Sequence, residues 1–145
     1  MVKGLFDTSI LVAALVADHP QHFYCFPWLQ RVKSGEIIGV VSTHSLAELY
    51  SVLTRSPLPQ PIKPKLAERL LAENLKTFEK VSLTAEDYQT TINLMVKLNI
   101  PGGAIYDALI AQAAIKSNVD ILLTLNPKHF IRLGEAIARL ITVPE

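Results

Sequence analysis

The sequence predicts an α/β fold, a three-layer α/β/α sandwich on a mainly parallel sheet of four or five strands. Two observations predict it. Short apolar runs rich in β-branched residues alternate along the 145 residues with longer segments of helical periodicity. Each apolar run ends at polar or acidic residues, which is typical of strands buried on both faces of a parallel sheet. Such alternation gives right-handed βαβ units, and the length suits a single domain over residues 1–145.

The predicted strands are short and continuously apolar. The first two, "VKGLF" and "EIIGVVS", end at acidic or hydroxyl residues. The five strand candidates are residues 2–6, 36–42, 78–83, 120–125 and 139–143.

The segments between these strands have apolar residues at helical spacing. In one of them, four leucines from Leu66 to Leu75 are expected on a single face. Another opens with Thr84 and has Asp87 three residues later, which resembles a capping box. The six helix candidates are residues 8–17, 19–35, 45–55, 63–78, 84–98 and 104–118.

A proline-rich segment connects the third and fourth helix candidates. Residues Ser56 to Pro64, "SPLPQPIKP", hold four prolines in nine residues. Such a segment cannot continue the preceding helix, so we expect an extended, semi-rigid connection. It could form a lip over a cleft or a contact surface.

Composition limits the class of protein. Half of the residues are hydrophobic, which favours a well-filled core and a buried dimer face. The net charge of +1 neither indicates nor excludes a nucleic-acid partner. Cys25 is the only cysteine, so an internal disulfide is impossible. No apolar stretch reaches the roughly 18 to 20 residues of a membrane span, so we expect no membrane partner and a cytoplasmic location.

Polar residues that follow the predicted strands form the candidate site. Asp7 ends the first strand, and Glu48 lies about one helical turn beyond the second. Asp107 lies in the first turns of the helix before the fourth strand, which delivers Thr124 and Asn126. Ligands of open parallel sheets bind at the carboxyl ends of the strands, so we expect these side chains to converge on one edge.

Three carboxylates, those of Asp7, Glu48 and Asp107, would then share a cleft. Unpaired, they would repel each other and raise their own pKa values. A divalent cation resolves this conflict, because carboxylate and water oxygens suit Mg²⁺ or Mn²⁺, which also take phosphate oxygens. The predicted chemistry is metal-assisted phosphodiester hydrolysis, in which the ion activates a water and neutralises developing charge.

Each of these residues also has a structural interpretation. Asp7 could cap a helix, Glu48 could lie on the solvent side of its helix, and Asn126 could be a turn residue before proline. Asp107 is harder to explain structurally because it is flanked by apolar residues in "AIYDALIA". The metal-site hypothesis therefore depends on the set and not on one member.

Four motifs in order resemble the PIN domain family, in particular its VapC-type toxin ribonucleases. They are "FDTSILVAAL", "HSLAELYSVLTR", "IYDALIAQAA" and "LLTLNPKHF", and the resemblance covers nearly the whole chain. It implies a metal-dependent endoribonuclease with a parallel-sheet α/β/α fold, commonly a homodimer. It also implies a small antitoxin protein that blocks the site.

By motif, Asp7, Glu48 and Asp107 resemble the family's acidic metal-binding triad. Thr8 or Ser9, and Thr124 further along the chain, resemble its accessory hydroxyls, which position water, metal or phosphate.

The chain departs from the family pattern at Asn126, where many relatives carry the aspartate of a T-x-D motif. Asparagine offers a carbonyl oxygen without a charge, so we keep Asn126 in the predicted catalytic set but expect weaker binding of any second metal. Asp120 cannot substitute, because it precedes its strand and so lies at the opposite end of the sheet.

Several basic residues are candidates for contacts with RNA phosphates. Solvated surface charge is the alternative interpretation for each of them. The candidates are His44, Arg55 and Lys128, with His129 and Arg132 near the same predicted edge.

Two histidines, His19 and His22, are three residues apart and could share a helix face. A metal pair is conceivable, but no carboxylate or third histidine stands beside them in the sequence.

Two other functions compete with the nuclease. An aspartyl-phosphate enzyme of the haloacid-dehalogenase type needs a second aspartate two residues after the first, where this chain has Ser9. A catalytically weak protein-binding module is compatible with Asn126, the high apolar content and the proline-rich segment.

Overall fold

The computed structural model describes residues 1–55 and 60–145. Its centre is a five-stranded sheet with the order β3-β2-β1-β4-β5, in which all neighbouring strands are parallel. The predicted fold class is therefore confirmed, and each strand lies within its predicted segment. The strands are β1 (Lys3–Phe6), β2 (Ile38–Ser42), β3 (Glu79–Val81), β4 (Ile121–Leu123) and β5 (Ile141–Thr142).

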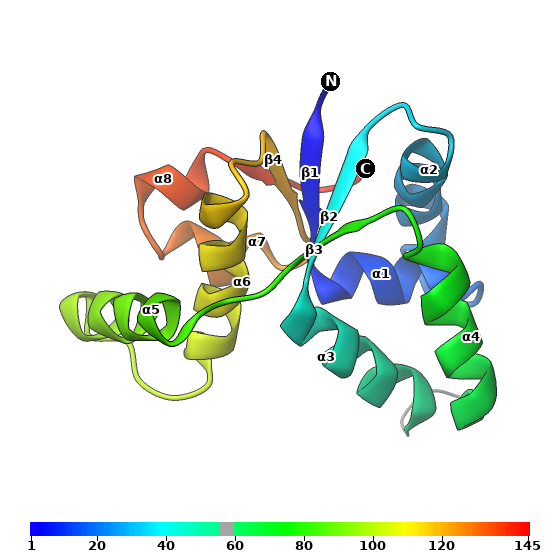
Figure 1. Cartoon of the computed structure of the whole chain (residues 1–145), viewed down its shortest axis with the longest axis horizontal. Coiled ribbons are helices and arrows are strands. Elements are labelled where there is room, and N and C mark those ends of the chain that lie inside the picture. Colours follow the sequence, from blue (N-terminus) through cyan, green and yellow to red (C-terminus); the bar gives the residue numbers. More distant parts are fainter. Residues whose placement is uncertain (56–59) are drawn as a thin grey trace.

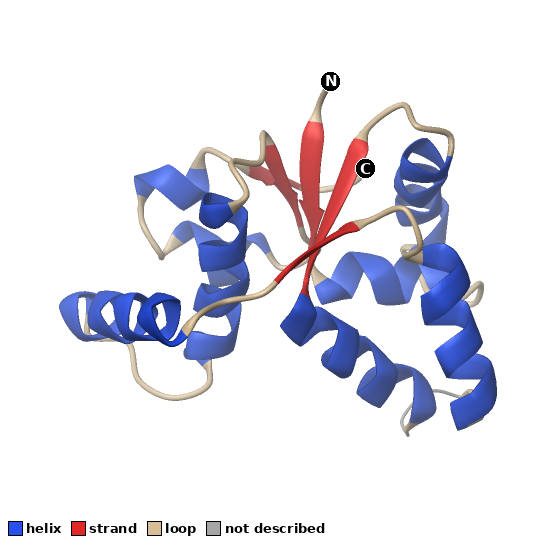
Figure 2. Ribbon diagram, viewed as in Figure 1, coloured by secondary structure: helices blue, strands red, loops and turns tan. Residues whose placement is uncertain are grey.

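Helices form a layer on each side of this sheet, with α1 to α4 on one side and α5 to α8 on the other (Figures 1 and 2). The last two were not predicted, because four or five residues are too few to show a helical period. The helices are α1 (Thr8–Leu15), α2 (His22–Lys33), α3 (Thr43–Thr54), α4 (Pro64–Asn74), α5 (Ala85–Leu98), α6 (Ala104–Lys116), α7 (Pro127–Ile131) and α8 (Glu135–Ala138).

The two faces of the sheet bury separate hydrophobic cores. Successive residues of a strand point to opposite faces, so neighbours within one strand join different cores. Phe6 and Val41 pack with α1 to α4, whereas Leu5 and Val40 pack with α5 to α8. This double burial explains why the strands read as continuous apolar runs.

Packing against β2 is tight at Gly39. A Cβ atom at this position would lie 2.7 Å from a ring carbon of Phe78 and 2.8 Å from a methyl group of Val32. Phe78 in turn packs edge-on against Phe6, with ring centroids 5.1 Å apart. The absence of a side chain at Gly39 lets α2 and the segment before β3 approach the sheet closely.

Details of two helices differ from the sequence prediction. Leu66 is 47% exposed, because the core-facing stripe of α4 carries Ala67 and the partly buried Leu71 and continues at the C-cap Leu75. Helix α6 ends at Lys116, before Asn118, whose φ of 52° is left-handed and cannot continue the helix. The predicted capping box at Thr84 is present.

The proline-rich connection is described only from residue 60 onward. Residues 60–63 have no regular structure, and Pro64 occupies the first turn of α4, where proline needs no hydrogen bond to its nitrogen. Residues 56–59, the first part of the predicted lip, lie outside the described residues. No helix in the described ranges is both long and apolar enough to cross a membrane.

The order of the strands creates a switch point between β1 and β4. The chain moves from β1 to β2 and β3 on one side, and then places β4 and β5 on the other side of β1. The connections that follow β1 and β4 therefore diverge and leave a crevice at their carboxyl ends. These ends lie at the lower edge of the sheet in Figure 1, where α1 and α3 begin.

Candidate active site

Asp7 lies where β1 passes into α1. It is the N-cap of α1, and its Oδ1 accepts a hydrogen bond from the backbone N–H of Thr8 at 2.9 Å. Its Oδ2 accepts two further hydrogen bonds, from Ser9 Oγ at 2.9 Å and from Thr124 Oγ1 at 2.8 Å. The residue is only 5% exposed and lines a cleft. Asp7 is thus both a helix cap and a cleft residue.

The same hydroxyls tie the loop after β4 to Asp7. Ser9 Oγ accepts the backbone N–H of Leu125 at 3.1 Å, and Thr124 Oγ1 accepts that of Asn126 at 3.0 Å. Each hydroxyl therefore donates to the carboxylate and accepts from the loop. The three predicted members of this network, Ser9, Thr124 and Asp7, are joined across the switch point as one unit.

A cleft of about 450 Å³ opens at this point of the fold. It brings together the carboxylates of Asp7, Glu48 and Asp107, which come from three distant segments of the chain. The lining residues are Asp7, Thr8, Ser9, Val12, His19, Glu48, Val52, Asp107, Leu125, Asn126 and His129.

The second and third carboxylates are each paired with a histidine. Glu48 lies in the second turn of α3, and its Oε2 is 3.9 Å from Nε2 of His44, one turn earlier. Asp107 lies in the first turn of α6, and its Oδ2 is 3.4 Å from Nδ1 of His129 on α7. Glu48 is partly exposed, so it faces both the cleft and solvent.

Burial and mutual repulsion disfavour the charged forms of two of these acids. Burial raises the pKa of Asp7, against the hydrogen bonds from Thr124 and Ser9, and the charge of Asp107 raises it further. Burial also raises the pKa of Asp107, and Glu48 adds to this effect while His129 opposes it. Both effects favour the protonated forms of Asp7 and Asp107 over their charged forms.

This donor set suits a hydrated Mg²⁺ or Mn²⁺ ion. Within the described ranges, no group of three or more histidine, cysteine, aspartate or glutamate side chains lies close enough together to hold a metal ion directly. Mg²⁺ keeps several of its water ligands and binds through one or two carboxylates, so spaced oxygen donors fit it better than a closed cage would. Thr8 Oγ1, buried with no hydrogen-bond partner among the described residues, is a further oxygen beside the cleft.

The three residues predicted to contact RNA lie outside the cleft lining. His44 adjoins it through its ion pair with Glu48. Arg55 follows the last turn of α3, where its Nη1 lies 3.5 Å from Ser51 Oγ, and Lys128 is exposed on α7. Exposed cations of this kind can reach a bound polymer but do not shape the cleft.

Two histidines line the cleft, and neither role was evident from the sequence. The sequence indicates His129 only as one of several basic residues that could contact RNA, whereas the structure places it beside Asp107. His19 reaches the cleft from the turn between α1 and α2, where its Nδ1 accepts the backbone N–H of Gln21 at 3.0 Å. His22 instead bonds the carbonyl of Ala13 and lines a different hollow, so the two histidines of the α1–α2 segment do not form a metal pair.

Known proteins resemble this chain in both sequence and fold. It is 33% identical over 115 residues to "Ribonuclease VapC27" of Mycobacterium tuberculosis, a match that covers 79% of each chain. It is 32% identical over 117 residues to "Ribonuclease VapC40" of the same species, covering 80% of this chain and 81% of the relative.

Solved structures share the fold at lower identity. The crystal structure of VapBC2 from Rickettsia felis, bound to a DNA fragment from its promoter, matches with a TM-score of 0.71 and 22% identity over 99% of this chain and 100% of that one. Mycobacterium tuberculosis VapC20, described as a sarcin-ricin loop cleaving toxin, matches with a TM-score of 0.63 and 18% identity, covering 82% and 86% of the two chains. The sequence model of the PIN domain family matches residues 5–136. The resemblance seen in the sequence is therefore confirmed, and the chain belongs to the PIN domain family.

Proposed function

We propose that this protein is an endoribonuclease that hydrolyses RNA phosphodiester bonds with Mg²⁺ or Mn²⁺, and that it is the toxin of a toxin–antitoxin pair. The observation that carries the proposal is the convergence of Asp7, Glu48 and Asp107 in one cleft at the switch point of the sheet. The names of its curated relatives, both ribonucleases of the VapC group, support the same activity.

The carboxylates and the hydroxyls of the cleft would have different roles. Asp7, Glu48 and Asp107 would hold the ion, and Ser9 and Thr124 keep the Asp7 carboxylate in one orientation. When bound, the ion supplies an activated water and neutralises negative charge at the scissile phosphate.

Two basic residues at the C-terminal part of α7 adjoin the carboxylates. His129 is paired with Asp107, and the Arg132 guanidinium is near enough to oppose the rise of the Asp107 pKa. These two side chains are suited to contact RNA phosphates beside the ion. Asn126, which lines the cleft without a charge, favours one tightly bound ion over two.

Cleavage of single-stranded RNA tests this proposal. Purified protein is incubated with several RNAs and Mg²⁺ or Mn²⁺, with and without EDTA. We expect metal-dependent cleavage that falls by about 100-fold or more in Asp7→Asn and Glu48→Gln, since removing one group that stabilises transition-state charge typically costs about 10²- to 10³-fold.

A matched control separates the site from general effects of charge. Glu73→Gln, like Glu48→Gln, removes a helical glutamate from an i,i+4 ion pair, but its exposed pair with Arg69 lies on α4 outside the cleft. Its activity should equal that of the wild type. Cleavage that survives EDTA would contradict metal dependence. Failure of the wild type to cut any of the RNAs would favour the protein-binding module.

A small antitoxin protein is the proposed physiological partner. Solved structures of the same fold include the VapBC2 assembly from Rickettsia felis and VapBC-1 from nontypeable Haemophilus influenzae. If a small open reading frame lies immediately upstream of the gene, its product should form a stable complex with this protein and suppress cleavage. A product that neither binds nor inhibits would argue against a toxin pair.

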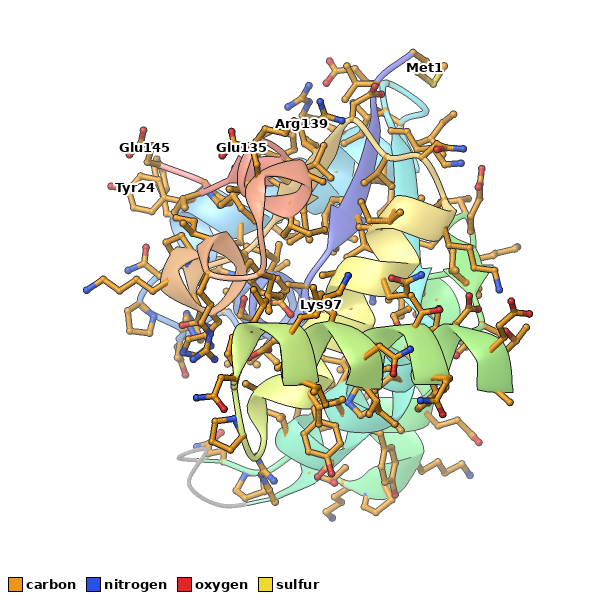
Figure 3. All side chains as sticks on the ribbon, turned by 90° about the vertical axis from the view of Figure 1, so that its left-hand side faces the viewer. Met1, Tyr24, Lys97, Glu135, Arg139 and Glu145 are labelled. Carbon is orange, nitrogen blue, oxygen red and sulfur yellow. The ribbon has the colours of Figure 1, made fainter. Side chains whose placement is uncertain are left out.

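We also infer that a second copy of the chain pairs through α5. Tyr88, Ile92 and Val96 form an exposed apolar stripe at i, i+4 and i+8, and are 44%, 45% and 73% exposed. In Figure 3 this helix runs across the front of the molecule. A hollow of about 290 Å³ beside the stripe is lined by Ile92, Met95, Val96, Asn99, Ile100 and Pro101.

The spacing of this stripe is self-complementary. Tyr88 lies one turn before Ile92, and the hollow that Ile92 borders extends the other way, to Pro101 just beyond the end of α5. A twofold axis at Ile92 would pair the helices antiparallel and place Tyr88 of each copy against the hollow of the other, as an isologous interface requires.

A further inference from the structure

Two aromatic rings from distant segments stack beside the cleft. His44 of α3 and Tyr106 of α6 have ring centroids 5.7 Å apart and planes only 7° from parallel. His44 is one helical turn before Glu48, and Tyr106 directly precedes Asp107. The paired rings therefore bridge the two helices that carry the second and third carboxylates.

Tyr106 leaves much of its side chain open to solvent. The residue is 54% exposed, while Ala108, Leu109 and Ile110 in the next turn of the same helix are buried. The Glu48 carboxylate lies 3.9 Å from Nε2 of His44, the second ring of the pair. The result is a pair of nearly parallel rings, of which Tyr106 is the more exposed.

The position of this surface fits a polymer whose phosphate lies at the carboxylates. Adjacent residues have Cα atoms 3.8 Å apart, and in a helix they point about 100° apart around the axis. Tyr106 and Asp107 thus present neighbouring faces of α6. His129 of α7 and Arg132, the C-cap of that helix, lie close to Asp107, and the Arg132 guanidinium supplies positive charge for the backbone of the same strand.

We propose that the stacked pair of His44 and Tyr106 is a nucleobase-binding subsite, on which the base of a nucleotide next to the scissile phosphate of single-stranded RNA stacks against Tyr106. The proposal rests on the ribonuclease function proposed above. Every base has a π-face, so the subsite binds an unpaired nucleotide whatever its base. It therefore selects single-stranded over duplex RNA.

The kinetic test compares Tyr106→Phe and Tyr106→Leu with the wild type. Stacking of one base on an aromatic ring contributes about 1 to 3 kcal/mol, which converts to about 5- to 150-fold in affinity. We expect Tyr106→Leu to raise KM by a factor in this range with a smaller change in kcat. Tyr106→Phe, which keeps the ring, should stay within about twofold of the wild type.

Tyr24→Leu is the matched control. Tyr24 is also partly exposed, but it lies on α2 near Glu145, as Figure 3 shows, and lines a different hollow. Its KM should not change. Equal melting temperatures of Tyr106→Leu and Tyr106→Phe would show that the ring is not needed for folding, whereas a KM for Tyr106→Leu equal to that of the wild type would overturn the proposal.

A binding measurement keeps the subsite testable independently of cleavage. The probe is a short single-stranded RNA with 2-aminopurine at one position, moved along the strand in a series and mixed with Asp7→Asn protein. Stacking on Tyr106 predicts that the 2-aminopurine fluorescence is quenched at one or two positions of the strand. The quenching should be lost when Tyr106→Leu is combined with Asp7→Asn in the same protein. If the wild type does not cleave RNA but the quenching is seen, the nuclease function is rejected and the subsite is kept. If the wild type cleaves RNA but no position is quenched, the subsite is rejected and the nuclease function is kept.

Discussion

The buried hydroxyl of Thr124 offers a quantitative test of the network around Asp7. Thr124→Val keeps the size of the side chain but removes the donor to Asp7 Oδ2 at 2.8 Å and the acceptor of the Asn126 N–H at 3.0 Å. A hydrogen bond to a charged group contributes about 1.5 to 3 kcal/mol and a neutral one about 0.5 to 1.5 kcal/mol. The expected loss of unfolding free energy is therefore about 2 to 4 kcal/mol.

Thermal and urea unfolding measure this loss. For a chain of 145 residues, each kcal/mol corresponds to roughly 2 to 4 °C, so the melting temperature should fall by roughly 5 to 15 °C. Thr124→Ser is the control, because it keeps the hydroxyl and loses only one methyl group, at a cost of about 1 kcal/mol.

The loss should also depend on pH. Burial holds the pKa of Asp7 above its usual value, and the Thr124 hydrogen bond opposes that rise. The native state thus binds the Asp7 proton more tightly than the unfolded state, and stability falls as pH rises from about 4 through the folded pKa. Without the hydroxyl this fall is steeper, so the deficit of Thr124→Val should be larger at pH 8 than at pH 4. A deficit equal to that of Thr124→Ser, or unchanged with pH, would refute this account.

Three other predictions concern the acids, the dimer and the sheet. Asp107→Asn should stabilise the metal-free protein at pH 8 by about 0.5 to 2 kcal/mol in urea unfolding, because it removes a half-buried charge that burial disfavours and that Glu48 repels. Mg²⁺ should then stabilise the variant less than the wild type; destabilisation of the metal-free variant would contradict this explanation. Ile92→Cys should form a disulfide-linked dimer on mild oxidation, seen by non-reducing electrophoresis. The wild type should not, because its cysteine, Cys25, is buried. An Ile92→Cys variant that stays monomeric would contradict a twofold axis at Ile92. Gly39→Ala should lower the free energy of unfolding by about 1 to 3 kcal/mol in the same assay, since its methyl group would overlap the Phe78 ring. An unchanged free energy of unfolding would mean that the ring moves aside without cost.

The sequence predicted the sheet well because the strands are buried on both faces. Their apolar runs are continuous, and the helices between them are long enough to show a period. Helices α7 and α8 escaped prediction because each has five residues or fewer. Leu66 was misplaced because periodicity defined an apolar face wider than the stripe from Ala67 to Leu75 that packs on the core.

The candidate site was predictable where residues follow strands, and less so elsewhere. Asp7, Glu48 and Asp107 could be grouped because the carboxyl ends of parallel strands share an edge. His19 could not, because its place depends on how the turn after α1 folds back over the cleft. The stack of His44 on Tyr106 joins residues 62 positions apart, and only the packing of α3 near α6 brings them together.

RNA cleavage by this protein is proposed to depend on a divalent cation held by the carboxylates of the cleft. The most direct measurement is the initial rate of RNA cleavage over a Mg²⁺ titration, for the wild type and for Asp107→Asn. We expect a wild-type rate that rises from background to saturation and returns to background with EDTA, and a rate in the variant that is lower by about 100-fold or more. Cleavage that is independent of Mg²⁺, or equal in the two proteins, would contradict it.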